Sequence, residues 1–319
     1  MWFTNTKLDF SAIALQAALL LLLAPLITGC IRSWKARLQN RRGPRLWQPY
    51  FDLLKFLRKD MVISEHASWI FSAAPYVVFV TALLTGLMVP LATTQAPLSL
   101  FGGVLAVIGL LALGRFFLAL GGLDPASAFG GMGSSREMTI AAIAEPALML
   151  AIFTVAITVG STDLSHIVAS AQQSGWDLLS PARLMAFAAL FIVLLAETGR
   201  VPIDNPATHL ELTMIHEAML LEYSGRYLAL MEWGASIKQL VLMAILVNIF
   251  LPVGLTAGTS AGLFGLGLII FLVKILLLSA AVVLVETVNA KLRLFRVPDL
   301  LSAAFVLATM ALLSTFLFH

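Results

Sequence analysis

The sequence has a single cysteine and few charged residues, and each shortage excludes a class of protein. Cys30 is the only cysteine among 319 residues, so this chain alone builds no disulfide, iron–sulfur cluster or thiolate zinc site. Charged residues make up 12% of the chain, and the formal net charge is +3. A charge this small does not indicate a nucleic-acid partner.

Apolar residues are abundant instead. They form 60% of the chain and the mean hydropathy is +0.96, which is more apolar surface than a soluble domain of this length hides. A helix needs about 20 apolar residues to cross a hydrocarbon core about 30 Å thick. The sequence therefore predicts an all-α, polytopic membrane protein with one membrane domain over residues 1–319 and about eight spans. We place them at residues 10–31, 69–93, 100–122, 137–160, 182–199, 236–257, 262–287 and 299–318.

The distribution of lysine and arginine near the ends of these spans predicts the orientation of the chain. One set of loops holds nearly all of these residues, whereas the opposite set holds Lys7 and Arg183. We therefore expect both termini on the outer side of the membrane and the segments 32–68 and 200–235 in the cytoplasm.

The segment 32–68 predicts an amphipathic helix at the membrane surface. Apolar Trp47, Phe51 and Leu54 recur at helical spacing, while Lys55 and Lys59 mark the other face. Basic interfacial helices bind anionic lipid headgroups. Because such a surface also suits a soluble partner, lipid anchoring and docking both stay open.

The segment 200–235 is unusual because it carries acidic residues. Asn205 followed by Pro206 is typical of a helix start. Glu211 and Glu222 are three helical turns apart and would share one face of that helix. Acidic residues do little to set orientation, so we interpret these two as functional or as partner-binding.

Ionisable side chains also interrupt the apolar spans. At a helix centre each costs about 2.5 to 3.5 kcal/mol on the insertion scale, so each is expected to pair, bind water or move protons. They are Arg115, Glu145, Glu197, Lys274 and Glu286. Burial without a fixed partner raises the pKa of a carboxyl group toward neutral pH, so a proton relay is one interpretation and structural pairing is the other. Glu197 and Arg200 are one helical turn apart and are expected to pair at least in part.

The spacing of histidines does not predict a metal site. His209 and His216 are seven residues apart, which matches neither the two-histidine zinc protease motif nor its reversed form. The sequence also contains no nucleophile elbow, phosphate-binding glycine loop or dinucleotide fingerprint. It therefore predicts neither a metal ligand set nor a catalytic residue in this chain.

Four motifs occur in the order found in one known family. They are residues 39–44 after the first span, 48–49 at the start of the surface helix, 197–204 leaving the fifth span, and 222–225. With them the chain resembles, over almost its whole length, the membrane subunit shared by respiratory complex I, where it is called subunit one, and energy-converting nickel–iron hydrogenases. Residues 122–124, 129–137 and 145–146 resemble the hydrogenase and formate hydrogenlyase branch.

The resemblance implies a non-catalytic coupling subunit in the cell inner membrane. The implied partners are the large and small hydrogenase subunits, an iron–sulfur subunit and antiporter-like membrane subunits. These partners would hold the nickel–iron (NiFe) centre and the iron–sulfur clusters, and this chain would bind no cofactor. The implied docking residues are Arg41, Arg42, Gly43, Pro44, Glu222 and Tyr223. Candidates for a proton path are Glu145, Glu197, Asp204, Glu211, Glu222, Lys274 and Glu286, and the candidate pairing charges are Arg115, Arg136 and Arg200.

The chain also departs from the family pattern. Three alternating glutamates are usual after Asp204, but Ala207 and His209 stand at two of these positions and only Glu211 remains. This departure counts against a quinone pocket, although a quinone-site subunit of complex I (NADH:quinone oxidoreductase) stays an alternative. An independent secondary transporter is the other, and the near absence of paired broken helices and of repeats disfavours it.

Overall fold

The computed structural model describes residues 10–173, 180–204, 214–255 and 261–318. Within these ranges the regular structure is helical, apart from one isolated bridge between Gly103 and Asp163, which confirms the predicted all-α class. The long helices are α1 (Phe10–Leu38), α3 (Trp69–Met88), α4 (Val104–Leu123), α5 (Ala128–Val159), α7 (Pro181–Glu197), α9 (Gly225–Phe250), α10 (Ala261–Val288) and α11 (Val297–Phe318). Shorter elements are α2 (Gln48–Arg58), η1 (Ser99–Phe101), α6 (Leu164–Gln173), α8 (His216–Leu220) and η3 (Leu294–Arg296).

Seven helices in the described part of the chain are long and apolar enough to cross a membrane, namely α1, α3, α4, α5, α9, α10 and α11. The span predicted at residues 182–199 corresponds to α7, whose 17 residues lie at the short end of the range of about 17 to 25 residues that crosses the hydrocarbon core. Helix α7 packs on α5, α9 and α11 inside the bundle. The chain is therefore a multi-pass membrane protein with α7 packed among longer helices.

Two helices begin earlier than their predicted spans. Helix α5 begins at Ala128 rather than at residue 137, because the Ser127 hydroxyl caps it by accepting a hydrogen bond from the Gly130 N–H at 3.2 Å. Helix α9 begins at Gly225 rather than at residue 236. As a result, Glu137 and Lys238 lie well inside membrane helices rather than at their ends.

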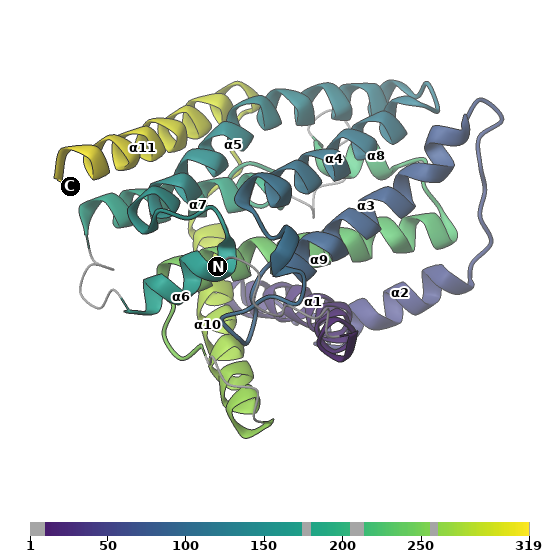
Figure 1. Ribbon diagram of the computed structural model, residues 1–319. Coiled ribbons are helices and arrows are strands. Elements are labelled where there is room, and N and C mark those ends of the chain that lie inside the picture. The colour runs from purple at the N-terminus through teal and green to yellow at the C-terminus, as the bar shows by residue number, and fades with distance from the viewer. Residues whose placement is uncertain (1–9, 174–179, 205–213, 256–260, 319) are drawn as a thin grey trace.

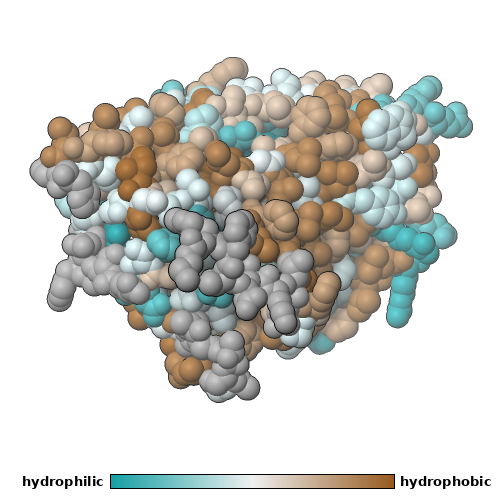
Figure 2. All heavy atoms as spheres, viewed as in Figure 1, coloured by the Kyte–Doolittle hydropathy of each residue, from teal (hydrophilic) through white to brown (hydrophobic). Residues whose placement is uncertain are grey.

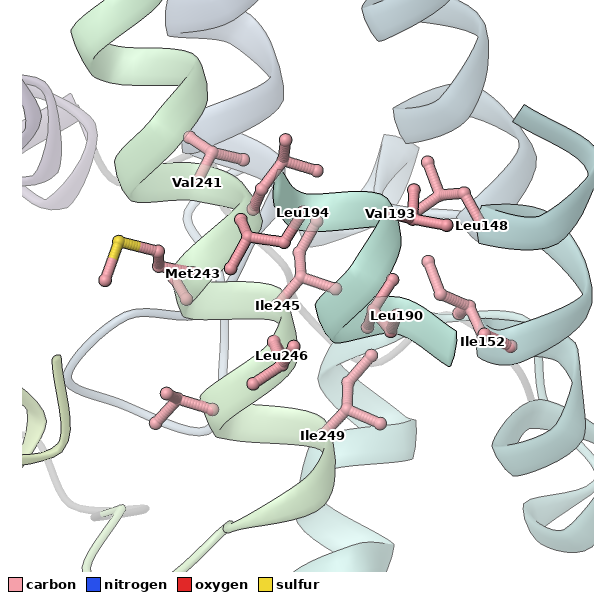
Figure 3. Packing of buried hydrophobic residues seen from close by; sticks show 14 of the residues in the cluster. Leu148, Ile152, Leu190, Val193, Leu194, Val241, Met243, Ile245, Leu246 and Ile249 are labelled. Atoms are coloured by element: carbon pink, nitrogen blue, oxygen red, sulfur yellow. The ribbon is translucent and has the colours of Figure 1, made fainter. Parts of the chain in front are cut away.

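The apolar core is centred on α7. Figure 3 shows Leu190, Val193 and Leu194 of α7 lying between α5 on one side and α9 on the other. Side chains from these neighbours, including Leu148 of α5 and Ile245 of α9, are 1% exposed. Close packing, rather than exclusion of water, holds helices together inside a bilayer. It fixes α7 in the bundle with its last residue, Glu197, in the interior.

Helix α10 extends away from the rest of the bundle (Figure 1) and makes most of its contacts with α1. One outer face of α10 is apolar and exposed: the exposed fraction is 63% at Ile269 and 67% at Leu277. Apolar surface is widespread on the face drawn in Figure 2. Exposure of this extent fits a hydrocarbon solvent, in which helices satisfy their own backbone hydrogen bonds.

The predicted surface helix is confirmed as α2, Gln48–Arg58. Pro49 and Leu53 are buried against the bundle, while Phe51 and Leu54 are exposed. The Tyr50 hydroxyl donates a hydrogen bond to the Leu22 carbonyl in α1, which fixes one side of α2 to that helix. Helix α2 therefore presents apolar side chains outward beside its basic residues.

Candidate functional site

Arg115 of α4 is the centre of a buried charge cluster. Its guanidinium contacts the carboxylates of Glu137 and Glu145 from α5 and of Glu197 from the end of α7. The distance is 3.7 Å from Nε to Glu137 Oε1 and 2.5 Å from an Nη to Glu145 Oε1. The five donors of a guanidinium suit several carboxylates at once. Helices α4, α5 and α7 thus meet at one arginine.

Lys238 of α9 adds a second cation to this cluster. Its Nζ lies 2.8 Å from Glu197 Oε2, the same oxygen that Arg115 contacts. Glu197 is the last residue of α7, where the negative end of the helix dipole disfavours a carboxylate. The two cations compensate for this position. With all groups ionised, three carboxylates and two cations give the cluster one negative charge.

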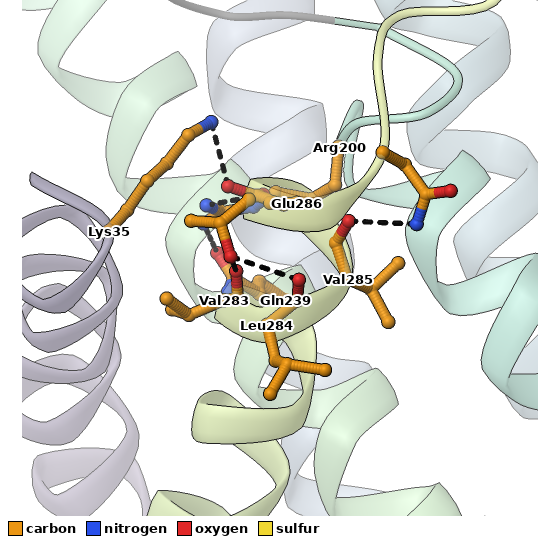
Figure 4. Close-up of polar contacts among 9 residues, drawn as sticks. Lys35, Arg200, Gln239, Val283, Leu284, Val285 and Glu286 are labelled. Carbon is orange, nitrogen blue, oxygen red and sulfur yellow. Dashed lines mark hydrogen bonds and ion pairs between the residues drawn. The ribbon is translucent and has the colours of Figure 1, made fainter. Parts of the chain in front are cut away.

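A second cluster surrounds Glu286 of α10 (Figure 4). Lys35 of α1 contacts its Oε2 at 2.8 Å, and Arg200 contacts its Oε1 at 3.2 Å. The Arg200 guanidinium also donates to the Gln239 side-chain oxygen at 2.8 Å. Lys238 and Gln239 are neighbours in α9, so that helix touches both clusters.

The expected pairing between Glu197 and Arg200 does not occur. Their carboxylate and guanidinium belong to different clusters, because α7 ends at Glu197 and Gly199 turns the chain with φ of +57°. Glycine adopts this left-handed conformation without a steric penalty. The i, i+3 rule holds only inside a continuous helix, so the pairing expected from the spacing is wrong.

The two clusters line one cavity of about 530 Å³. Apolar side chains from α3, α4 and α9 form part of its wall, among them Val78, Leu111, Leu118 and Met231. Charged side chains line the rest, and these are Arg32, Lys35, Arg41, Arg42, Arg115, Glu197, Arg200, Asp204, Glu217, Glu232 and Lys238. A liquid water occupies about 30 Å³, so a cavity of this size, with charged groups in a largely apolar wall, has room for several waters or a small ligand.

A second pair of carboxylates lies in the wall away from Arg115. An Nη of Arg32 lies 3.9 Å from a carboxylate oxygen of Glu232. The carboxyl group of Glu217 in α8 is close enough to Glu232 for the two to interact electrostatically. Burial, and then the negative charge of Glu232, raise the pKa of the Glu217 carboxyl above its ordinary value. Glu217 therefore holds a proton more readily than an exposed glutamate does.

Asp204 and Arg136 fix the backbone around α8. The Asp204 Oδ2 accepts hydrogen bonds from the backbone N–H groups of Ile215 and His216, each at 3.2 Å. Its Oδ1 lies 2.8 Å from Lys291 Nζ. The Arg136 guanidinium donates to the Met214 carbonyl at 2.9 Å. Both residues thus orient the wall of the cavity.

Several predicted site residues lie away from this cavity. Lys274 of α10 donates to the Asn248 side chain at 3.1 Å and to the Leu251 carbonyl at 3.0 Å, at the opposite end of α9. Glu222 is exposed, and Tyr223 is buried with its ring stacked on Phe71 at 4.1 Å between centroids. Glu211 lies outside the described residues.

The predicted docking motif after α1 is partly at the cavity. Arg41 and Arg42 are exposed and contribute to its wall, Pro44 is exposed, and Gly43 packs against α1. A Cβ on Gly43 would lie 2.9 Å from the Ser33 carbonyl oxygen, so a larger residue there displaces the turn. The motif therefore holds two arginines beside the cavity.

Sequence reasoning missed three members of the clusters: Lys35, Glu137 and Lys238. Lys35 belongs to the basic residues that predict the orientation of the chain, and Glu137 and Lys238 lie at the ends of the predicted spans. A lysine thirteen residues into an apolar helix is the signal that would have found Lys238. Within the described residues no group of three or more His, Cys, Asp or Glu is arranged to hold a metal ion.

Comparison with known proteins places the chain in a family. The family model described as NADH dehydrogenase matches residues 10–317. Hydrogenase-4 component C of Escherichia coli (strain K12) is 35% identical over 297 residues, which cover 93% of this chain and 92% of that protein. Formate hydrogenlyase subunit 4 of the same organism is 35% identical over 301 residues, covering 94% and 96%.

A solved structure has the same fold. A chain of the membrane-bound sulfane sulfur reductase, an archaeal respiratory membrane complex, matches 95% of this chain and 99% of its own length with a TM-score of 0.82 and 22% identity. The resemblance predicted from the four motifs is confirmed, including its hydrogenase side. Because the family model covers nearly the whole chain, the protein belongs to the NADH dehydrogenase family of membrane subunits.

Proposed function

We propose that this chain is the membrane anchor and coupling subunit of an energy-converting hydrogenase complex in the cell inner membrane. Its relatives named for hydrogenase-4 and formate hydrogenlyase match over more than nine tenths of both chains. In this proposal the hydrogenase large and small subunits and an iron–sulfur subunit dock on the cytoplasmic loops. Antiporter-like membrane subunits lie alongside, and electron transfer takes place in the partners.

The docking surface in this proposal combines α2, the exposed part of the 41–44 turn and the exposed turn that carries Glu222. Arg41 and Arg42 are exposed, and no ion pair is found for either within the described residues. Unpaired exposed arginines suit acidic groups of a protein partner, because guanidinium binds carboxylate in a bidentate fashion. Phe51 and Leu54 supply an adjacent apolar area, as interfaces commonly have.

The cluster around Arg115 carries the coupling part of the proposal. Three carboxylates in the membrane interior are costly, and all three converge on one arginine at the wall of the cavity. The Glu145 side chain is 33% exposed on α5, whereas Glu197 is 2% exposed. A path from Glu217 and Glu232 through the cavity to Glu197 and Glu145, which Arg115 holds together, would end at the surface of α5. There it would meet a neighbouring membrane subunit.

Glutamine substitutions test this path in the intact complex reconstituted into liposomes. Hydrogen formation reports the redox reaction, and a potential-sensitive dye reports charge movement whether protons or sodium ions move. We expect Glu145→Gln and Glu197→Gln to assemble and form hydrogen while the dye signal falls by about tenfold or more, since a positioned proton-transfer group contributes about 10²- to 10⁴-fold. The exposed Glu65→Gln is the matched control. Undiminished charge movement in both buried variants would remove the coupling role.

The size of the cavity favours one second candidate, a quinone-binding subunit of the complex I type. A volume of about 530 Å³ with an apolar wall lies within the range of small-molecule sites. Lipid extraction of the purified complex, followed by chromatography, measures bound quinone. The hydrogenase proposal expects no stoichiometric quinone and no inhibition by quinone-site ligands, and the second candidate expects both.

A further inference from the structure

Lys238 is the more accessible partner of the most buried carboxylate of the cluster, Glu197, at the wall of the cavity. Its side chain is 18% exposed and contributes to the cavity wall, whereas the side chain of Glu197 is 2% exposed. Their ion pair measures 2.8 Å. The cavity therefore reaches the amine, and the amine reaches the carboxylate.

Only one of the two cations on Glu197 can give up a proton. Arginine stays protonated in proteins, whereas a lysine amine releases and regains its proton in many catalytic sites. Arg115 is therefore a permanent counter-charge for Glu197. Lys238 is the cation at this carboxylate that can also act as a proton donor.

We propose that Lys238 transfers protons between the cavity and Glu197, which makes it a further residue of the coupling path; this inference rests on the proposed function. In the inward step, one N–H bond at Nζ breaks and one O–H bond forms at the Glu197 carboxylate. The neutral amine then takes a proton from a protonated acid in the cavity wall, such as Glu217, by way of cavity water, and that acid becomes a carboxylate. One proton has moved from the cavity to Glu197, and no electron is transferred.

Proton transfer within the Lys238–Glu197 pair keeps the net charge of the cluster constant. Before it, Arg115 and Lys238 face three carboxylates, and the net charge is minus one. Transfer within the pair leaves that charge unchanged, so it adds no uncompensated charge to a region of low dielectric constant. Uptake of the second proton by Lys238 then makes the cluster neutral. The protonated Glu197 lies on the same guanidinium as Glu145, the next carboxylate of the path.

The second lysine of the cavity wall is a matched comparison. Lys35 is 17% exposed and lies 2.8 Å from buried Glu286, which resembles the Lys238 pair closely. Glu286, however, is bound on its other side by Arg200, whose further partner is the amide of Gln239. An amide takes up no proton, whereas the Arg115 guanidinium holds a second carboxylate, Glu145, beside Glu197. The Lys35 branch therefore ends at Glu286, and the Lys238 branch continues to Glu145.

The test measures charge movement in the liposome-reconstituted complex during hydrogen formation. Lys238→Arg keeps the positive charge but removes the transferable proton, so we expect assembly and hydrogen formation with a dye signal lowered by about tenfold or more. Lys274→Arg makes the same change outside the cavity and should keep the parental signal. A normal signal in Lys238→Arg, or an equal loss in Lys274→Arg, would overturn the assignment to Lys238.

A chemical variant separates proton transfer from packing. Lys238→Cys in a Cys30→Ala background is alkylated with one of two reagents. Bromoethylamine restores an amine of nearly lysine length. Its trimethylammonium analogue restores the positive charge without a transferable proton. We expect recovery with the first reagent only, and the Cys30→Ala complex that retains Lys238 receives both reagents as the control. Equal recovery with both reagents reduces Lys238 to a counter-charge and overturns the inference. Failure of the proposed function is distinguishable, because Glu197→Gln would then move charge normally.

Discussion

Removal of the Arg115 guanidinium should destabilise the whole chain, because that single group compensates three carboxylates. Arg115 is 4% exposed and joins α4 to Glu137, Glu145 and Glu197. Arg115→Met keeps the apolar stem but changes the net charge of the cluster from minus one to minus two. Breaking a buried ion pair by removing one partner costs about 3 to 5 kcal/mol. Even the lower figure changes the ratio of folded to unfolded chain by about a hundredfold.

The assay is the amount of chain in purified membranes and the temperature at which the detergent-solubilised chain aggregates. We expect Arg115→Met to lower both, and Arg115→Lys to give an intermediate result, because a single ammonium cannot form a fork to several carboxylates. The decisive variant adds Glu145→Gln and Glu197→Gln to Arg115→Met. The cluster of this triple variant then holds one cation, Lys238, and one carboxylate, Glu137, so its net charge is zero. Much of the stability lost in Arg115→Met should therefore be restored. Parental stability of Arg115→Met, or no gain in the triple variant, would refute the reasoning.

Three further predictions concern the loops, the titration of one carboxyl and the metal content. Single cysteines at the exposed positions Arg45 and Glu222 should be protected from a membrane-impermeant maleimide in the intact complex and labelled after the soluble arm is stripped. Val253→Cys, at the far end of α9, is the control. Equal labelling of the Arg45 and Glu222 positions in both states contradicts docking on these loops. The pKa of Glu217 is raised above 4.5, so the folded chain binds its proton more tightly than the unfolded chain, and stability should fall as pH rises from about 4.5 through the raised value. Glu217→Gln should flatten that slope in thermal denaturation followed from pH 4 to 8, and an unchanged slope contradicts the assignment. Plasma mass spectrometry of the separated subunit should find no stoichiometric iron, nickel or zinc, since one cysteine and five scattered histidines supply no conventional site.

The positions of the membrane helices follow from the sequence because the bilayer imposes their length and polarity. The start of α5 does not, since residues 129–135 are rich in glycine and serine and resemble a loop. In the fold these small residues allow close helix contact: a Cβ on Gly133 would lie 2.8 Å from the Ala218 Cβ. Small residues let membrane helices approach closely, so packing overrides the local preference.

The ionisable residues of the candidate site were predictable, but their partners were not. Arg115, Glu145 and Glu197 are conspicuous because charge in an apolar run is costly. Glu197 nevertheless pairs with Arg115, 82 positions away, and with Lys238 rather than with nearby Arg200. Local spacing carries no information on which distant helix supplies the counter-charge. That choice depends on how α4, α7 and α9 pack.

The described segment 198–204, which follows α7, connects the two clusters with the start of α8. It follows Glu197 of the first cluster, passes Arg200 in the second, and reaches Asp204, which binds the backbone at the start of α8. Proline at position 202 and the hydrogen bond from the Leu292 N–H to the Pro202 carbonyl, at 2.8 Å, limit the freedom of this segment. Asp204 binds the backbone N–H of His216, the first residue of α8, and Glu217 follows it in that helix. A partner that shifts α8 must therefore displace or strain the segment that holds Arg200. In the proposed function, partner binding at α8 would therefore act on the charges in the membrane through the backbone of residues 198–204 rather than through the apolar core.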